Sequence, residues 1–205
     1  MNQIWNRIIY KMWSPFYDHF FNSGAFFRAR KAVFSDQSFE KGNTVLLAGC
    51  GTGADLDFLP VKELDITAVD FSADMLQKAR EKYPSSGVSF MQMDATSMSL
   101  PTEAFDVVIA SLLLSVVPAP DKCLAEMIRV AKPNGRIIIF DKFVPKHQTL
   151  SLLKKAARPL ISVMGTDIGV SFEQLSRPLE DQYVIVTDTP VMFNGMYRKI
   201  ILVKK

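Results

Sequence analysis

Three glycines at alternate positions follow an apolar run of strand length, and this stretch is the best suited of the chain to binding a ligand. The run ends at Ala48 and leads into Gly49, Cys50, Gly51 and, two residues later, Gly53. This order predicts a buried strand that turns tightly into a helix. Glycine adopts positive φ angles without strain and lets a ligand approach the backbone closely. We therefore expect a nucleotide-like ligand at this turn, beyond the carboxyl end of the strand.

Two carboxylates stand where further strands are expected to end. Asp70 closes the apolar stretch 64–70, 21 positions after the first glycine of the turn. An acid at that place can accept hydrogen bonds from both ribose hydroxyls of an adenosine. The stretch 88–93 leads into Asp94 and Ala95, which offer a side-chain acceptor and backbone groups at the height of an adenine ring. Three successive strand ends are thus predicted to point at one ligand.

Further contacts to this ligand are expected from residues near the same edge. Phe71 follows the ribose-binding acid directly, and Met75 lies at the start of the next helix. Ser111 stands at the carboxyl end of the fourth expected strand, and Tyr10 belongs to the N-terminal segment. The run from Ser111 to Ser115 is almost wholly apolar, and we expect it to form the wall against which a second substrate binds.

The pattern as a whole resembles the class I S-adenosylmethionine-dependent methyltransferases, from about residue 44 to residue 141. It consists of the glycine turn, Asp70, Asp94-Ala95 and Lys132-Pro133-Asn134-Gly135. The resemblance implies S-adenosylmethionine as cofactor, methyl transfer as reaction, and an α/β fold with a doubly wound, mostly parallel seven-stranded sheet. Asn134 stands where this family usually has glycine, and Asn also tolerates left-handed backbone angles.

The elements that position these residues alternate between strand and helix, which predicts a parallel sheet with helices on both faces. Helices are expected at about 54–60 and 73–82, and another is expected to be capped by Asp121. The stretches 183–189 and 196–204 alternate as strands do and are separated by Pro190 and Asn194-Gly195. They predict an antiparallel C-terminal hairpin at the edge of the sheet.

Composition is that of a globular chain with one core. With 205 residues and 48% apolar content, the chain can bury a full core. No apolar run reaches the roughly 18 residues of a spanning helix, and we expect no signal peptide. Cys50 and Cys123 have no metal-ligand spacing, so we expect reduced, structural thiols and no bound metal.

Charge is unevenly distributed along the chain. Basic residues outnumber acidic ones six to three in 1–43, six to two in 142–177 and four to none in 191–205. The remainder is acidic, which favours an anionic partner near the basic parts, although such asymmetry can also serve solubility alone. We expect that partner to be a phospholipid surface rather than a nucleic acid.

Two basic amphipathic stretches could provide this membrane contact. Residues 1–13 place apolar side chains, both tryptophans among them, at helical spacing, and residues 150–164 do the same within an insertion at 142–177. We divide the chain into an N-terminal segment 1–43 and a methyltransferase core 44–205 that carries the insertion. The aromatic residues of the N-terminal segment could instead pack on the core and cover the cofactor. The protein is expected in the cytoplasm, attached peripherally to the inner face of the membrane.

Candidate catalytic residues lie in the N-terminal segment. Methyl transfer from a sulfonium needs mainly alignment and desolvation, because the leaving group is a neutral thioether. Tyr17, Asp18 and His19 could orient the acceptor or take a proton from it, and aromatic faces could hold a methylated ammonium by cation–π attraction. An isolated histidine is more often structural, and this alternative stays open for His19.

A narrower resemblance is to the short bacterial phosphatidylethanolamine N-methyltransferases. It rests on Tyr10-x-x-Trp13-x-Pro15-x-Tyr17-Asp18, Arg30-Lys31, Ser115-Val116-Val117-Pro118 and the amphipathic stretch after the fifth strand. The ubiquinone and menaquinone C-methyltransferases share a Tyr-Asp pair and the same core, so quinone methylation is the first alternative. Ala48 stands where both groups often carry Glu, which removes one acidic contact near the methionine amino group.

Three other functions remain as alternatives. One is N- or O-methylation of a soluble small molecule. Another is a dehydrogenase, because Gly49, Gly51 and Ala54 also satisfy the dinucleotide pattern; Gly53 and the later motifs speak against it. The last is a non-catalytic module of the same fold that binds membranes or another protein.

Overall fold

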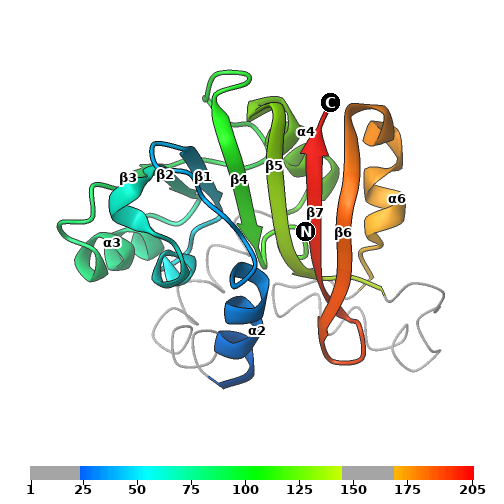
Figure 1. Ribbon diagram of the computed structural model, residues 1–205, viewed down its shortest axis with the longest axis horizontal. Coiled ribbons are helices and arrows are strands. Elements are labelled where there is room, and N and C mark those ends of the chain that lie inside the picture. Colours follow the sequence, from blue (N-terminus) through cyan, green and yellow to red (C-terminus); the bar gives the residue numbers. More distant parts are fainter. Residues whose placement is uncertain (1–23, 145–168) are drawn as a thin grey trace.

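The computed structural model describes residues 24–144 and 169–205, drawn in colour in Figure 1. Its α-helices are α2 (Gly24–Phe34), α3 (Ala73–Lys82), α4 (Pro120–Val130) and α6 (Phe172–Ser176). Short 3₁₀ helices are η1 (Ala54–Phe58), η2 (Val61–Glu63) and η3 (Arg177–Gln182). The strands are β1 (Thr44–Ala48), β2 (Asp65–Asp70), β3 (Ser89–Gln92), β4 (Phe105–Ser111), β5 (Ala131–Lys142), β6 (Tyr183–Met192) and β7 (Tyr197–Lys204).

The described strands form one seven-stranded sheet in the order β3-β2-β1-β4-β5-β7-β6. All neighbours from β3 to β5 pair in parallel, whereas β7 pairs antiparallel with both β5 and β6. The chain reverses its winding between β3 and β4, so the crevice between β1 and β4 is the place where this topology binds ligands. The predicted α/β fold with a C-terminal antiparallel hairpin is confirmed.

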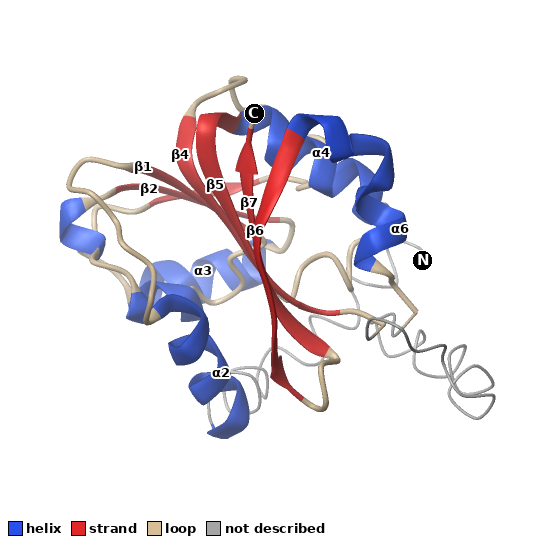
Figure 2. Cartoon of the chain, turned by 45° about the vertical axis from the view of Figure 1, so that its right-hand side comes forward, coloured by secondary structure: helices blue, strands red, loops and turns tan. Residues whose placement is uncertain are grey.

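Helices cover both faces of the sheet, as Figure 2 shows with α4 and α6 on one side and α2 and α3 on the other. Alternate residues of the central strands point to the two faces, so the sheet separates two apolar clusters. In β5, Ile137 and Ile139 belong to the cluster under α4, and Ile138 and Phe140 belong to the cluster under α2. This continuous apolar run, buried on both faces, is typical of a central parallel strand.

Two predicted helices differ from the structure. The stretch after Gly53 is the five-residue 3₁₀ helix η1 rather than an α-helix to residue 60. It ends because Leu59, which precedes a proline, takes an extended conformation, and residues before proline avoid the α region. Asp121 does not cap α4: the helix begins one residue earlier, at Pro120, after Ala119. Proline suits that first position because its missing N–H would have no helical partner there.

The C-terminal hairpin turns where it was predicted to turn, but its first strand is longer. Asn194 and Gly195 have φ angles of 52° and 84° and lie in the turn between β6 and β7. Pro190 was predicted to separate the strands and instead lies within β6, opposite Arg198. An edge strand accepts proline because one of its sides has no hydrogen-bonding neighbour, and the pairing register shifts between Pro190 and Met192.

Helix α2 shows how part of the N-terminal segment is used. Phe26 and Phe34 are buried in the cluster between α2 and the sheet, which supports core packing for these aromatics, whereas Phe27 is 44% exposed. Arg30, in the same basic, aromatic part of the segment, also packs into the interior rather than facing a lipid surface. Its Nε lies 2.8 Å from Oδ1 of Asp55, and its side chain is 5% exposed. The ion pair fastens α2 to η1, directly after the glycine turn.

Candidate active site

The glycine turn has the backbone that its sequence predicts. Gly49, Gly51 and Gly53 have φ angles of 66°, 54° and 82°, in the left-handed region where side chains are strained. A Cβ on Gly49 would lie 2.5 Å from Cδ1 of Leu113, and one on Gly53 would lie 2.8 Å from the ring of Tyr83. A Cβ on Gly51 would meet nothing within 4 Å. A side chain at either outer glycine would have to displace Leu113 or Tyr83, whereas the middle glycine faces open space.

Asp70 ties the glycine turn to the end of β2. Its Oδ2 accepts a hydrogen bond of 2.8 Å from the N–H of Gly51, and its Oδ1 accepts one of 2.8 Å from the N–H of Ser72. Burial raises the pKa of Asp70, and these two hydrogen bonds offset part of that rise. A carboxylate has about four lone-pair positions, so each oxygen retains the capacity to accept a further donor.

The other predicted contact residues differ in what they present. Phe71 leaves a flat side chain 43% exposed beside Asp70, suited to stacking, whereas the side chain of Met75 is buried in the core. Asp94 accepts hydrogen bonds from the N–H and hydroxyl of Thr96, at 2.8 and 2.7 Å. The side chain of Ala95 is buried in the cluster under α4, so only its backbone can contact a ligand.

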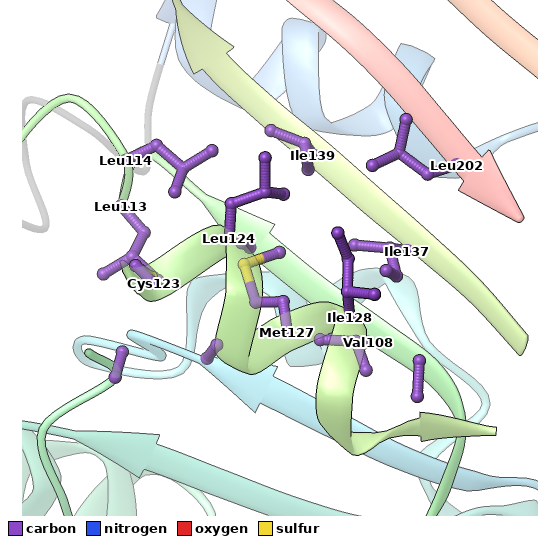
Figure 3. Packing of buried hydrophobic residues seen from close by; sticks show 14 of the residues in the cluster. Val108, Leu113, Leu114, Cys123, Leu124, Met127, Ile128, Ile137, Ile139 and Leu202 are labelled. Carbon is purple, nitrogen blue, oxygen red and sulfur yellow. The ribbon is translucent and has the colours of Figure 1, made fainter. Parts of the chain in front are cut away.

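The expected apolar wall at residues 111–115 is only partly a wall. Leu113, Leu114 and Ser115 are buried, and Figure 3 shows the two leucines packed near Cys123 and Leu124 of α4. The prediction that all of this run faces a second substrate is therefore wrong. Leu112 keeps partial exposure, and so do Val116 and Val117 just beyond.

Ser111 is the residue of this run that most resembles a ligand contact. It is the last residue of β4, next to the glycine turn in the sheet order. Its Oγ is buried and has no hydrogen-bond partner within residues 24–144 and 169–205. A buried hydroxyl without a partner costs free energy, so Ser111 is suited to an additional polar group from a ligand.

Both cysteines are free thiols, as predicted. Burial raises the pKa of Cys50 well above its ordinary value, and the negative charges of Asp70 and Asp55 add to the rise. Burial likewise raises the pKa of Cys123. Both side chains are therefore protonated at neutral pH and poor nucleophiles. Cys50 can contribute its backbone to the turn, where its N–H donates to the carbonyl of Val69 over 2.9 Å.

Four predicted site residues lie outside the described residues. They are Tyr10 as a cofactor contact and Tyr17, Asp18 and His19 as catalytic candidates. The amphipathic stretches 1–13 and 150–164 are outside them as well. Within the described part of the chain, no helix has the length and apolar character needed to cross a bilayer. The acidic, histidine and cysteine residues of the same part form no group of three or more that could hold a metal ion.

Two features of the site were missed in the sequence. Leu113 packs on Gly49, and local sequence patterns cannot predict this contact because the two residues are 64 positions apart. Asp141 ends the apolar run of β5 as a fully buried carboxylate. A charged residue closing such a run could have been noticed, since the same reasoning found Asp70 at the end of β2.

These residues fit S-adenosylmethionine. Gly51 faces open space on the turn, which allows close approach, and Asp70 can accept hydroxyl donors. Phe71 offers an exposed aromatic face, and the Ser111 hydroxyl lacks a partner in the described part of the chain. An adenosine with a charged amino-acid tail needs acceptors, a flat apolar surface and exposed backbone, and this edge of the sheet presents all three.

Comparisons with known proteins agree with this geometry. A family model described as "Methyltransferase domain" matches residues 46–139. The chain is 32% identical to a phosphatidylethanolamine N-methyltransferase of Cereibacter sphaeroides over 77% of this chain and 78% of that one. It is 35% identical to a demethylmenaquinone methyltransferase of Renibacterium salmoninarum over 55% of this chain and 46% of that one, so it spans about half of that relative.

A solved structure supports the fold independently. The crystal structure of an S-adenosylmethionine-dependent methyltransferase from Thermotoga maritima, described as a possible histamine N-methyltransferase, has a TM-score of 0.73 to this chain. The match covers 98% of this chain and 100% of the other, at 20% identity. With the glycine turn, the strand-end carboxylates and a sequence relative that is similar over three quarters of its length, the chain belongs to the class I S-adenosylmethionine-dependent methyltransferases.

Proposed function

We propose that the enzyme methylates an amphipathic acceptor, namely the amine of phosphatidylethanolamine or of its partly methylated forms. The observation that carries this proposal is the similarity, over 77% of the chain, to a protein named as a phosphatidylethanolamine N-methyltransferase. The partly exposed apolar residues Leu112, Val116 and Val117 beyond β4 support it, because acyl chains favour apolar contacts.

We assign the cofactor to the glycine turn. When bound, S-adenosylmethionine supplies an electrophilic methyl group on a sulfonium. In this proposal Asp70 accepts hydrogen bonds from the ribose hydroxyls, Phe71 stacks on the adenine, and the hydroxyl of Ser111 bonds a polar group of the ligand. Gly49, Gly51 and Gly53, the backbone of Cys50, and Asp94 with the backbone of Ala95 complete the binding surface. Met75 contributes through its buried side chain, which packs α3 onto the core, rather than through a direct contact with the cofactor.

The acceptor amine must lose its proton before it attacks the methyl group. An apolar environment helps because it disfavours the ammonium form. We propose that Tyr17, Asp18 and His19 lie on the acceptor side and that Tyr10 covers the cofactor. Aromatic faces among them would attract a methylated ammonium by about 0.5–2 kcal/mol per ring.

Methylation of a quinone precursor is the second candidate, favoured by the 35% identity to a demethylmenaquinone methyltransferase. The reaction at a ring carbon requires a base to remove the ring proton. Asp18 and His19 are the residues that we consider for that role. A soluble amine is the third candidate and would need no apolar surface beyond β4.

A single assay separates these acceptors. Phosphatidylethanolamine in vesicles, a demethylated menaquinone and a water-soluble amine are each incubated with the enzyme and S-adenosylmethionine labelled in the methyl group. We expect label in the phospholipid, and the variant Asp70→Ala serves as a control with impaired cofactor binding. Label in the quinone alone would replace the first proposal by the second, and label in the soluble amine alone would exclude both lipophilic acceptors.

Variants of Tyr17 test the proposed acceptor side. If its ring contacts a methylated ammonium, Tyr17→Phe should keep most of the activity and Tyr17→Ala should lose it. If its hydroxyl bonds the acceptor or the cofactor, both variants should lose activity. Equal, undiminished activity in both would remove Tyr17 from the site.

We also propose reversible attachment to anionic membranes through residues 1–13 and 150–164. Each Lys or Arg near such a surface contributes about 1 kcal/mol, and the attraction falls off within a Debye length of roughly 8 Å at physiological salt. Flotation with vesicles should therefore require anionic lipid and decrease as salt is added. Equal flotation with zwitterionic vesicles at every salt concentration would refute the electrostatic contribution.

A further inference from the structure

Asp141 is a buried carboxylate that, within residues 24–144 and 169–205, accepts hydrogen bonds from backbone N–H groups. It lies next to the last residue of β5 and is 0% exposed. Its Oδ2 accepts from the N–H of Ser115 at 3.1 Å, and its Oδ1 accepts from the N–H of Lys142 at 2.7 Å. Burial raises the pKa of Asp141, and the nearby Ser115 side chain, together with these two N–H groups, offsets part of that rise. Burying a carboxylate in this way is costly, so a residue with only a packing role would be apolar here.

The loop that Asp141 contacts leaves the sheet in a strained conformation. Leu112, directly after β4, has a φ of 57°, which a branched side chain rarely adopts. Its N–H donates to the carbonyl of Phe140 over 2.7 Å. The N–H groups of Val116 and Val117 then donate to the carbonyl of Leu113, at 3.0 and 3.1 Å, and close a turn. Such a conformation persists only where surrounding contacts fix it.

Ser115 lies in this turn and is 3% exposed. The loop is therefore fastened to β5 at two points, through Leu112 to Phe140 and through Ser115 to Asp141. Both fastenings end on buried residues, Phe140 and Asp141, so each hydrogen bond that is lost leaves a buried polar group without a partner.

The same loop packs on the glycine turn. Cδ1 of Leu113 occupies the space in which a Cβ of Gly49 would stand, 2.5 Å from that position. Leu113 therefore packs closely against Gly49, and a small shift of the loop would change this contact. Asp141 is thus connected to the glycine turn first through its contact with Ser115 and then through Leu113, which lies in the same loop.

We infer that Asp141 is a positioning residue of the methyltransferase site: by holding Ser115, it fixes the loop Leu112–Val117 and thereby keeps Leu113 seated on Gly49 in the geometry that binds the cofactor. In this inference Asp141, which is 0% exposed, acts through Ser115. The inference does not depend on which acceptor the enzyme uses, since the cofactor site alone reports it.

The chain contains a matched control at the opposite edge of the sheet. Asp106, near the start of β4, accepts from both the N–H and the hydroxyl of Thr44, each at 2.8 Å. This pair also joins a carboxylate to a hydroxyl residue, but it lies at the amino ends of the strands, away from the glycine turn. Unlike Asp141, Asp106 is partly exposed and forms an ion pair with Lys132 over 2.8 Å. Asp106→Asn and Thr44→Ala therefore mimic the chemical change of Asp141→Asn and Ser115→Ala without touching the loop.

The test measures binding of S-adenosylhomocysteine by isothermal titration calorimetry, with the thermal midpoint of each variant recorded in parallel. Asp141→Asn should weaken binding roughly tenfold, as loss of one buried hydrogen bond would. Ser115→Ala removes the hydroxyl but keeps the N–H that donates to Asp141, so the variant should fold and should weaken binding only about threefold. The double variant should resemble Asp141→Asn, because both changes break one contact.

Amide hydrogen exchange distinguishes a local effect on the loop from a general loss of stability, which would accelerate exchange throughout the protein. Ser115→Ala should accelerate amide exchange in peptides covering residues 112–117 and 49–53, and Thr44→Ala should leave them at the wild-type rate. The inference is overturned if Ser115→Ala binds S-adenosylhomocysteine as the wild type does. It is also overturned if all four single variants lose affinity in proportion to their thermal midpoints. If Asp141→Asn does not fold, the affinities and exchange rates of Ser115→Ala and Thr44→Ala are sufficient to test the inference.

Discussion

Replacing Asp70 by Asn is expected to weaken binding of S-adenosylhomocysteine by ten- to a hundredfold. The carboxylate of Asp70 already accepts the N–H groups of Gly51 and Ser72, each at 2.8 Å, and its remaining lone pairs are proposed to accept the ribose hydroxyls. Hydrogen bonds to a charged acceptor contribute about 1.5–3 kcal/mol, and each 1.4 kcal/mol corresponds to about a tenfold change in affinity. Calorimetric titration measures the loss directly.

Two comparisons make this experiment specific. Asp65→Asn alters the exposed carboxylate at the other end of the same strand and should leave affinity unchanged. The analogue 2′-deoxy-S-adenosylhomocysteine lacks one of the hydroxyls, so the penalty of Asp70→Asn should be smaller for it than for the full ligand. An equal penalty for both ligands would mean that Asp70 acts only by holding the N–H of Gly51, which would refute its assignment to the ribose.

The acidity of Asp70 adds a dependence on pH. Burial raises its pKa in the folded protein, and we expect the ionised form to be the one that binds the ribose. Cofactor affinity should therefore be full above this raised pKa and should be lost as the pH falls through it. In the same range Asp70→Asn should show a flatter profile, and identical profiles for the two proteins would contradict the prediction.

Three further predictions concern the free energy of unfolding, measured by urea denaturation. Arg30→Met leaves its buried carboxylate partner without a cation and should cost about 3–5 kcal/mol of unfolding free energy; Lys82→Met, which breaks an ion pair with side chains 40% and 45% exposed, should cost at most about 1 kcal/mol. Gly49→Ala should destabilise more than Gly87→Ala, because both have positive φ but only the first meets a neighbour within 4 Å; equal losses would show that the neighbour yields freely. Glu126→Gln should lower stability at neutral pH by less than about 1 kcal/mol. The hydrogen bond from Arg129 lowers the pKa of Glu126 below its usual 4.5. The stability difference between this variant and the wild type should therefore vanish as the pH falls through the lowered pKa of Glu126.

Membership of the methyltransferases could be recognised from local patterns. The glycine spacing, the acid at the end of 64–70 and the alternation of strand and helix each depend on residues close together in the chain. A tight turn requires positive φ at particular positions, and a strand buried on both faces requires a continuous apolar run. These are demands of the backbone itself, so Gly49 and Asp70 were found where the structure has them.

Predictions from apolar spacing failed where a single proline determines how a helix begins or ends. Whether the stretch after Gly53 is an α-helix depends on Leu59, whose conformation is set by the following proline. Similarly, proline at the first position of α4 removed the need for Asp121 as a cap. In both cases the apolar spacing was read correctly and the competing preference of proline was missed.

Only the tertiary structure decided which side chains meet across the sheet. Arg30 belongs to a basic, aromatic stretch that suggests a membrane surface, yet Asp55, 25 residues away, draws it into the interior. Leu113 was expected to face a substrate and instead closes over Gly49, and Asp141 reaches Ser115, 26 residues earlier in the chain. The sequence determined the turn and the carboxylate that can bind a nucleotide, because those follow from backbone geometry and periodicity. The burial of a charge and the neighbour of a loop depend on long-range packing, since they are fixed only when distant segments compete for the same space.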